Sequence, residues 1–224
     1  MEILKRRLYI LLAVMLCAGG VYAQKSLDAK TLDGSSASSK NRIFDGLSVG
    51  VDLVGPIMYQ ISSYGDYQAY LQANIKGKYL PIVELGYGRS NKSYEITDIT
   101  YKTKAPFGRI GCDVNLLKNK HDKYRATIGL RYGITSFDYD TTAPTDSLHT
   151  QFTTSSEKCT LHWAELAFGV DAKIWGPVHM GWSFRYRKRL HISDYVHDPL
   201  YAPGFGNASE GTSLMALYTV SLEI

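Results

Sequence analysis

The sequence predicts an all-β fold, a closed eight-stranded antiparallel up-and-down transmembrane β-barrel. From residue 43 onward the recurrent pattern is an alternation of apolar and polar residues, and no run reaches the length of a transmembrane helix. Eight segments carry the alternation, and each is about ten residues or longer, the length that a tilted strand needs to cross a bilayer. The connections between them are alternately long and short, as in bacterial outer-membrane barrels.

The N-terminus predicts a secretory signal peptide over residues 1–23. Basic residues at 5–7 precede an apolar run over 8–16, and the segment ends in small residues with cleavage expected after Ala23. We therefore expect export and, after cleavage near Ala23, localisation in the outer membrane.

The next segment, residues 24–42, is polar and rich in serine and shows no apolar periodicity, so it predicts a flexible periplasmic tether. The barrel is expected over residues 43–224. The whole chain has a formal net charge of +4 and no basic cluster typical of nucleic-acid binding, so we expect no nucleic-acid partner.

The first four strands are predicted over 44–54, 67–79, 81–90 and 105–116. Each places apolar residues at every second position, which gives one apolar face per strand. In chain order these faces are Leu47, Val49, Val51 and Leu53; Ala69, Leu71, Ala73 and Ile75; Val83, Leu85 and Tyr87; Ile110, Cys112, Val114 and Leu116.

The last four strands are predicted over 124–137, 161–175, 178–191 and 213–224, with the same alternation. Their apolar faces are Ala126, Ile128, Leu130, Tyr132 and Ile134; Ala164, Leu166, Phe168, Val170, Ala172 and Ile174; Val178, Met180, Trp182, Phe184 and Tyr186; Leu214, Ala216, Tyr218, Val220, Leu222 and Ile224.

Glycine decides which face is outside. Most strand glycines share the polar parity with the charged residues, and glycine weakens a solvated exterior face but makes room inside a narrow barrel. The polar face is therefore predicted to line the lumen, and the apolar face to contact lipid. The predicted network of lumen charges is Asp52, Glu84, Arg109, Asp113, Arg125, Arg131, Glu165, Asp171, Arg185 and Arg187.

Hairpin register predicts which of these charges pair. Across the short turn at 176–177, Glu165 falls opposite Arg187 or Arg189, with Arg185 as a diagonal neighbour. Across the turn at 117–123, Asp113 is expected to meet Arg125. Such a filled and charged lumen argues against an open pore.

With both termini periplasmic, the long connections lie outside the cell. They are 55–66, 91–104, 138–160 and 192–212. Their tyrosines predict contact with an unknown protein or glycan partner, or with lipopolysaccharide headgroups. These tyrosines are Tyr59, Tyr64, Tyr94, Tyr101, Tyr139, Tyr195 and Tyr201. Asp140 and Asp146 begin triplets that resemble the O-glycosylation acceptor of Bacteroidota.

The architecture resembles the small outer-membrane barrels of the OmpA and OmpX type. The C-terminal strand "LMALYTVSLEI" resembles the signal that barrel-assembly machinery reads, although Ile224 stands where an aromatic residue is usual. "PLYAPGFG" at 199–206 is similar to uncharacterised outer-membrane barrel families of the Bacteroidota. These resemblances imply fold and location, and no activity.

Two alternatives to a non-enzymatic outer-membrane barrel remain at this point. One is a soluble periplasmic ligand-binding barrel. The other is a lipid A-modifying acyl hydrolase, because His191, Ser193 and Asp194 resemble the layout of lipid A deacylase barrels. Parity directs His191 and Ser193 into the lumen, away from a lipid substrate, unless a bulge at the rim reverses it.

The remaining chemistry-bearing residues predict no catalytic, metal or cofactor site. No histidine has metal-ligand spacing, and Cys112 and Cys159 are expected as free thiols on non-neighbouring strands. The histidines other than His191 are His121, His149, His162, His179 and His197.

Overall fold

The computed structural model of the chain describes residues 44–94, 98–117, 123–145 and 151–224. The predicted signal peptide and tether, Asp146, His121 and His149 lie outside these residues. The described elements are β1 (Phe44–Asp52), α2 (Val54–Ile61), β2 (Tyr64–Ile75), β3 (Tyr79–Tyr94), β4 (Ile99–Asn115), β5 (Tyr124–Pro144), β6 (Phe152–Trp175), β7 (Val178–Ile192), β8 (Tyr201–Ala202), β9 (Gly206–Asn207) and β10 (Thr212–Glu223).

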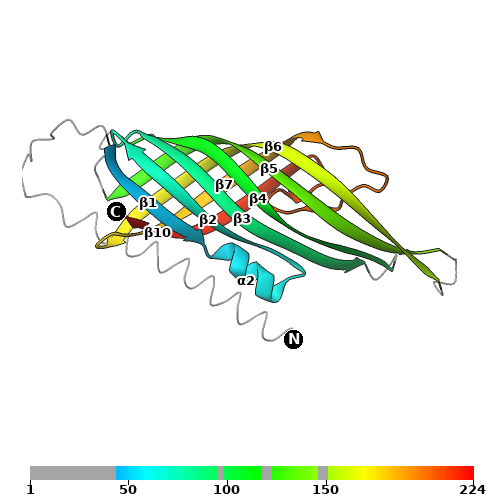
Figure 1. Cartoon of the computed structure of the whole chain (residues 1–224). Coiled ribbons are helices and arrows are strands. Elements are labelled where there is room, and N and C mark those ends of the chain that lie inside the picture. The colour runs from blue at the N-terminus through cyan, green and yellow to red at the C-terminus, as the bar shows by residue number, and fades with distance from the viewer. Residues whose placement is uncertain (1–43, 95–97, 118–122, 146–150) are drawn as a thin grey trace, which may run out of the picture. The chain divides into compact units, whose positions relative to one another are not determined.

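Eight of the strands form one closed antiparallel barrel in the order β1-β10-β7-β6-β5-β4-β3-β2 (Figure 1). Apart from the closing pair of β1 with β10, each strand is bonded to its neighbour along the barrel strands of the chain, which is an up-and-down meander. The predicted fold class is confirmed. We call the end with the tight turns, where β1 begins and β10 finishes, the terminal end. The opposite end, which carries α2 and the long connections, is the loop end.

The wall of the barrel is apolar outside and polar inside. Large hydrophobic side chains such as Leu85, Leu130 and Phe184 are more than half exposed, whereas Glu165 and Arg187 are buried. A soluble protein would place these two classes the other way round. Among the described residues, no helix has the length and apolarity that a membrane crossing requires.

Aromatic side chains border the apolar band at both ends. Tyr67 and Tyr87 pair across β2 and β3 near the loop end, where Tyr132 also faces outward. Tyr79 and Trp175 are exposed near the terminal end. Rings with an apolar body and a polar tip favour the boundary between a bilayer and water.

Four strands, β3 to β6, extend beyond this band at the loop end, and here the predicted bounds were wrong. Most of 138–160, predicted as a loop, belongs to β5 and β6, and β4 begins at Ile99 (Figure 1). Threonine-rich stretches favour strand structure, and Thr142 and Thr154 lie opposite each other with their hydroxyl oxygens 2.9 Å apart. We call residues 99–104, 138–144 and 152–160 the extension.

The short helix α2 was not predicted, because it has only eight residues and contains a glycine and a proline. Pro56 falls in its first turn, where a missing N–H costs nothing. The carboxylate of Asp52 accepts hydrogen bonds from the N–H groups of Val54 and Gly55, at 3.2 and 2.7 Å. Asp52, predicted as a lumen charge, is buried and binds the first N–H groups of this helix from the position before its N-cap, Leu53.

The main difference from the sequence prediction concerns residues 199–208, which fold into the barrel instead of forming an exposed loop. β8 and β9 form a small hairpin there, and Ala202, Phe205 and Ala208 are fully buried. They pack with inward-facing side chains of β4, β5 and β6, including Phe107 and Trp163. We call residues 199–208 the plug, because they fill the loop-end half of the lumen.

Candidate functional site: the plugged lumen

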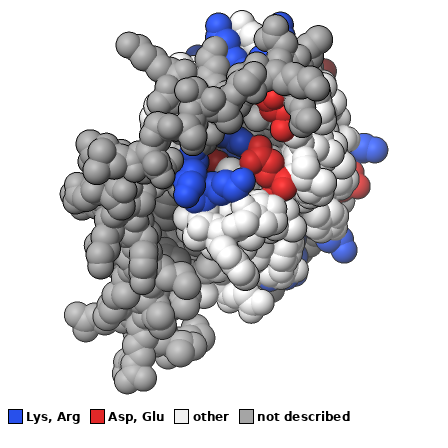
Figure 2. Space-filling model, turned by 90° about the vertical axis from the view of Figure 1, so that its left-hand side faces the viewer, with Lys and Arg blue, Asp and Glu red and all other residues white. Residues whose placement is uncertain are grey.

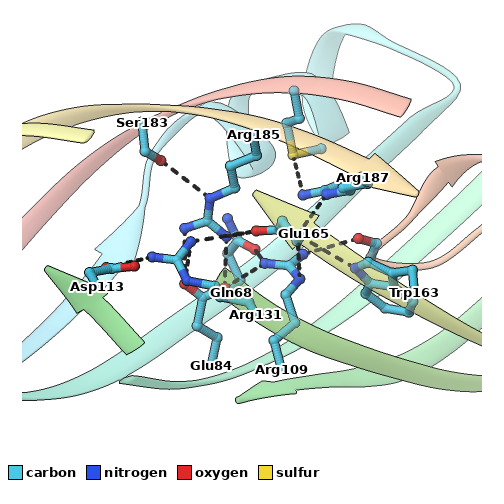
Figure 3. Close-up of polar contacts among 12 residues, drawn as sticks. Gln68, Glu84, Arg109, Asp113, Arg131, Trp163, Glu165, Ser183, Arg185 and Arg187 are labelled. Atoms are coloured by element: carbon cyan, nitrogen blue, oxygen red, sulfur yellow. Dashed lines mark hydrogen bonds and ion pairs between the residues drawn. The ribbon is translucent and has the colours of Figure 1, made fainter. Parts of the chain in front are cut away.

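Arginines and carboxylates occupy the middle of the lumen (Figure 3). Glu84 of β3 forms ion pairs through its Oε2 atom with the Nη1 atoms of Arg109, at 2.6 Å, and Arg185, at 2.7 Å. Each strand from β3 to β7 contributes at least one member, because inward positions at the same height meet inside a narrow barrel. We call this group the central cluster. Its members are Glu84, Arg109, Asp113, Arg131, Glu165, Arg185 and Arg187.

Glu165 is the most connected carboxylate of the central cluster. Arg187 lies directly opposite it and donates Nε–H at 2.9 Å, so the predicted Glu165–Arg187 pair is confirmed. Arg185 approaches Glu165 at 3.1 Å and Arg131 at 3.4 Å. Arg109 completes the set at 3.6 Å. A single buried carboxylate thus shares its negative charge among four guanidinium groups.

The central cluster also holds the plug. Arg109 donates to the carbonyl oxygen of Gly204 and Arg187 to that of Phe205, both at 3.1 Å. Arg189 donates to the carbonyl oxygen of Ala208 at 2.6 Å. The polar lumen therefore binds the backbone of a segment whose side chains pack into the apolar core above it.

Tyrosines fasten the other side of the plug. The Tyr201 hydroxyl donates to the carboxylate of Asp66 at 2.7 Å, and the Tyr101 hydroxyl donates to the carbonyl oxygen of Tyr201 at 2.6 Å. Tyr101 and Tyr139, predicted as exposed loop tyrosines, are buried. Their burial corrects the prediction that these two rings are available to an outside partner.

A second charged group lies at the terminal end. Arg125 pairs with Glu223 of β10, and His179 lies 2.9 Å from Asp171 and 3.0 Å from Glu223. The predicted Asp113–Arg125 pair is wrong, since Asp113 pairs with Arg131 at 2.8 Å. Arg125 and Asp171, both predicted as lumen charges, belong to this second group.

A cavity of about 70 Å³ separates the two groups, with Tyr70, Thr127 and Ser221 among its lining residues. This volume accommodates on the order of five water molecules. Figure 2 views the terminal end and shows basic and acidic side chains facing each other in a hollow. The lumen thus has room for water toward the terminal end and is filled by protein toward the loop end.

The rim residues predicted for a hydrolase do not form a catalytic arrangement among the described residues. The Ser193 hydroxyl accepts from the Thr160 N–H at 2.9 Å and lies 3.4 Å from the Cys159 sulfur. No described hydrogen bond joins it to His191 or Asp194. The prediction that His191 faces the lumen is wrong, because a bulge in the β6–β7 pairing turns it outward.

Glu157 anchors the loop that leads into the plug. Its carboxylate accepts from the N–H groups of Val196 and His197, at 2.9 and 3.3 Å, and from the Tyr139 hydroxyl at 2.9 Å. Its other oxygen lies 2.5 Å from His197 Nδ1. Glu157 falls in the loop predicted over 138–160, but it lies in β6, beyond the apolar band.

The hydrogen bond from His197, aided by the backbone N–H donors, lowers the pKa of Glu157 to about 2. Because the folded pKa lies below that of the free carboxyl, 4.5, the stabilisation is complete above pH 4.5 and is lost as the pH falls toward 2. We expect hydrogen exchange at the Val196 and His197 amides, relative to intrinsic rates, to accelerate across this window. Glu157→Gln should abolish that pH dependence, whereas Asp140→Asn, an exposed change in the extension, should preserve it.

Several partners in the site were not predicted from the sequence. Glu223, His179 and Asp66 lie on inward positions, so strand parity alone could have identified the first two. The plug carries a different signal. Its residues are apolar within a connection that is otherwise polar, which favours burial over exposure.

Comparisons with known proteins give a fold-level likeness and a family. The chain is similar to the crystal structure of Neisserial surface protein A, with 10% identity, 81% of this chain and 99% of that chain covered, and a TM-score of 0.41. It is also similar to the N-terminal β-barrel domain of Pseudomonas aeruginosa OprF, with 8% identity, the same coverages and a TM-score of 0.38. No curated protein matches it. A family model described as "Domain of unknown function (DUF6048)" matches residues 4–224, and the chain therefore belongs to this family.

Proposed function

We propose that the protein is a closed, non-enzymatic outer-membrane barrel that anchors a surface-exposed binding structure. Both termini are proposed on the periplasmic side and the loop end outside the cell, after export and removal of a signal peptide. The single observation that carries this proposal is the inverted wall, which is apolar outside and holds a buried charge network inside. A soluble ligand-binding barrel has the opposite distribution, so this alternative is not supported.

The filled lumen supports anchoring rather than transport. The plug occupies one half, and the central cluster closes the middle with side chains that are almost fully buried. A solute would have to displace both an apolar core and a set of paired charges.

The resemblance to Bacteroidota barrels and recognition by the barrel-assembly machinery stay predictions.

The extension supports a binding role at the surface. It projects beyond the apolar band as a paired sheet, and its outward face alternates charges, with Lys104 opposite Asp138 and Asp138 opposite Lys158. A rigid sheet with exposed polar side chains loses little conformational entropy when a partner binds. A protein or a glycan is therefore the proposed class of partner.

The proposal is tested first by fractionation and electrophoresis. The protein is expected in the outer membrane, and unheated samples should migrate differently from heated ones because a closed barrel resists unfolding in detergent. Recovery in the soluble periplasm, or identical migration before and after heating, contradicts the membrane assignment.

The binding role of the extension is tested by crosslinking in cells. A photoreactive residue at position 140, in place of Asp140, should crosslink a partner. One in place of Trp175, which is exposed at the terminal end, should not give the same product.

A further inference from the structure

A bulge near the end of β7 changes which residues face outward. Trp163 pairs with Arg189, but the preceding residue of β6, His162, pairs with His191, so Leu190 has no partner in the ladder. One extra residue reverses the parity of all that follow it. His191 consequently faces outward instead of into the lumen, while Ile192 packs against the apolar core.

The bulge completes a row of polar side chains on the outside of the barrel. His162 and His191 lie opposite each other with ring centroids 6.0 Å apart. The Tyr132 hydroxyl lies 2.6 Å from His162 Nδ1. Lys188, also exposed, lies opposite Ala164, one outward position closer to the middle of the apolar band. The row therefore spans three adjacent strands within two successive outward positions, with Tyr132 and Lys188 on one level and His162 and His191 on the next.

This row combines hydrogen-bond donors with outward strand faces of β5, β6 and β7 that carry no acid next to it; the exposed acids Asp194 and Glu210 lie in the loop before β10. Outward positions of β5 from Ala126 to Ser136, of β6 from Thr160 to Ile174 and of β7 contain no carboxylate. The next outward residue of β5 toward the loop end is Asp138, already opposite two lysines. From the row toward the terminal end the outward face is apolar, with Leu130, Leu166 and Phe184 exposed.

We propose that Tyr132, His162, His191 and Lys188 form a binding site for the phosphate of an outer-leaflet lipid. The site lies where the apolar band ends, which is the height of lipid headgroups in a spanning barrel. Imidazole and phenol N–H and O–H groups with one ammonium suit phosphate oxygens, while the lipid's acyl chains cover the apolar face below. This inference rests on the proposed membrane location.

The test uses full-length mature protein, with ¹⁵N-labelled histidine, in dodecyl maltoside micelles. We titrate in phosphatidylglycerol, monophosphoryl lipid A, uncharged diacylglycerol or inorganic phosphate, and follow the imidazole signals assigned through His162→Asn and His191→Asn. Saturable shifts at His162 and His191 with a phosphorylated lipid are expected, and His197, beyond the band, should not shift. Lys188→Ala should weaken binding about tenfold, because it removes one charge-assisted hydrogen bond. Lys104→Ala, which removes a lysine placed opposite Asp138, should have no effect.

The outcomes separate this site from the barrel itself. Equal shifts with diacylglycerol, or equal weakening by Lys188→Ala and Lys104→Ala, would overturn the phosphate site even though the protein still shows its heat-dependent migration. Saturation by inorganic phosphate at the same concentration would overturn the lipid assignment and leave a soluble anion as ligand. The ratio of the affinities for phosphatidylglycerol and lipid A identifies which phosphorylated lipid is preferred.

Discussion

Replacing Glu165 with alanine is expected to lower the free energy of unfolding by about 3 to 5 kcal/mol, because it leaves buried guanidinium groups without their shared carboxylate. Arg187 is fully buried and loses its ion pair, and Arg185 loses one of its two. Water cannot readily replace the carboxylate, since Glu165 and Arg187 are buried and neither lines the cavity toward the terminal end. The midpoint of the heat-dependent gel shift, or urea unfolding in detergent, measures the change.

The controls separate charge from packing. Glu165→Gln retains the volume and the acceptor oxygen but not the charge, so it should destabilise less than alanine. Glu210→Ala removes an exposed carboxylate between the plug and β10 and should change stability by less than about 0.5 kcal/mol. Glu157→Ala is unsuitable as a neutral control, because Glu157 anchors the loop before the plug. Equal behaviour of Glu165→Ala and Glu210→Ala would contradict a desolvated central cluster.

The barrel could be predicted because side-chain alternation in a strand depends only on local geometry. A period of two assigns each residue to one face, and the short turn at 176–177 then fixes the register that places Glu165 opposite Arg187. The positions of the glycines predicted which face lines the lumen, because a narrow lumen leaves no room for a Cβ beside the charged side chains. A Cβ at Gly129 would lie 1.8 Å from Asp113 Oδ1.

The same crowding explains the pair that was wrong. Asp113 lies opposite Gly129, and Arg131 lies opposite Gly111, where a Cβ would be 2.5 Å from Arg131 Cγ. Each charged side chain therefore lies over a glycine of the neighbouring strand, and Arg131 can reach Asp113. The strand register across the turn at 117–123 could not predict that Asp113 pairs with Arg131, because an arginine side chain is long enough to reach several carboxylates.

The plug and the bulge depend on tertiary structure, so no local pattern predicts them. An apolar stretch in a long connection can bind a partner, insert in lipid or fold back, and only the space left above the central cluster decides between these outcomes. The bulge at Leu190 adds a residue without any glycine or proline to mark it. It also invalidated the parity argument used for His191.

Phe205→Ala is the second change with a large expected effect. The Phe205 side chain is fully buried, its ring meets that of Trp163 at 5.9 Å in an edge-on arrangement, and its carbonyl oxygen accepts from Arg187. Removing a buried phenylalanine ring costs about 3 to 5 kcal/mol when the cavity cannot collapse. We expect this loss to fall first on the plug, because the barrel ladder bonds do not depend on Phe205.

Hydrogen exchange distinguishes plug release from unfolding of the whole barrel. In Phe205→Ala the amides of 199–208 should exchange faster, while those in the middle of β5 stay protected. Val196→Ala is the matched control, since Val196 lies in the same connection with 84% of its surface exposed and should change neither region. Because Arg109 and Arg187 would lose carbonyl acceptors when the plug leaves, a charged opening should appear at the loop end and admit water to the central cluster. If Phe205→Ala and Val196→Ala exchange alike, the plug does not pack inside the barrel and the lumen is not closed by it.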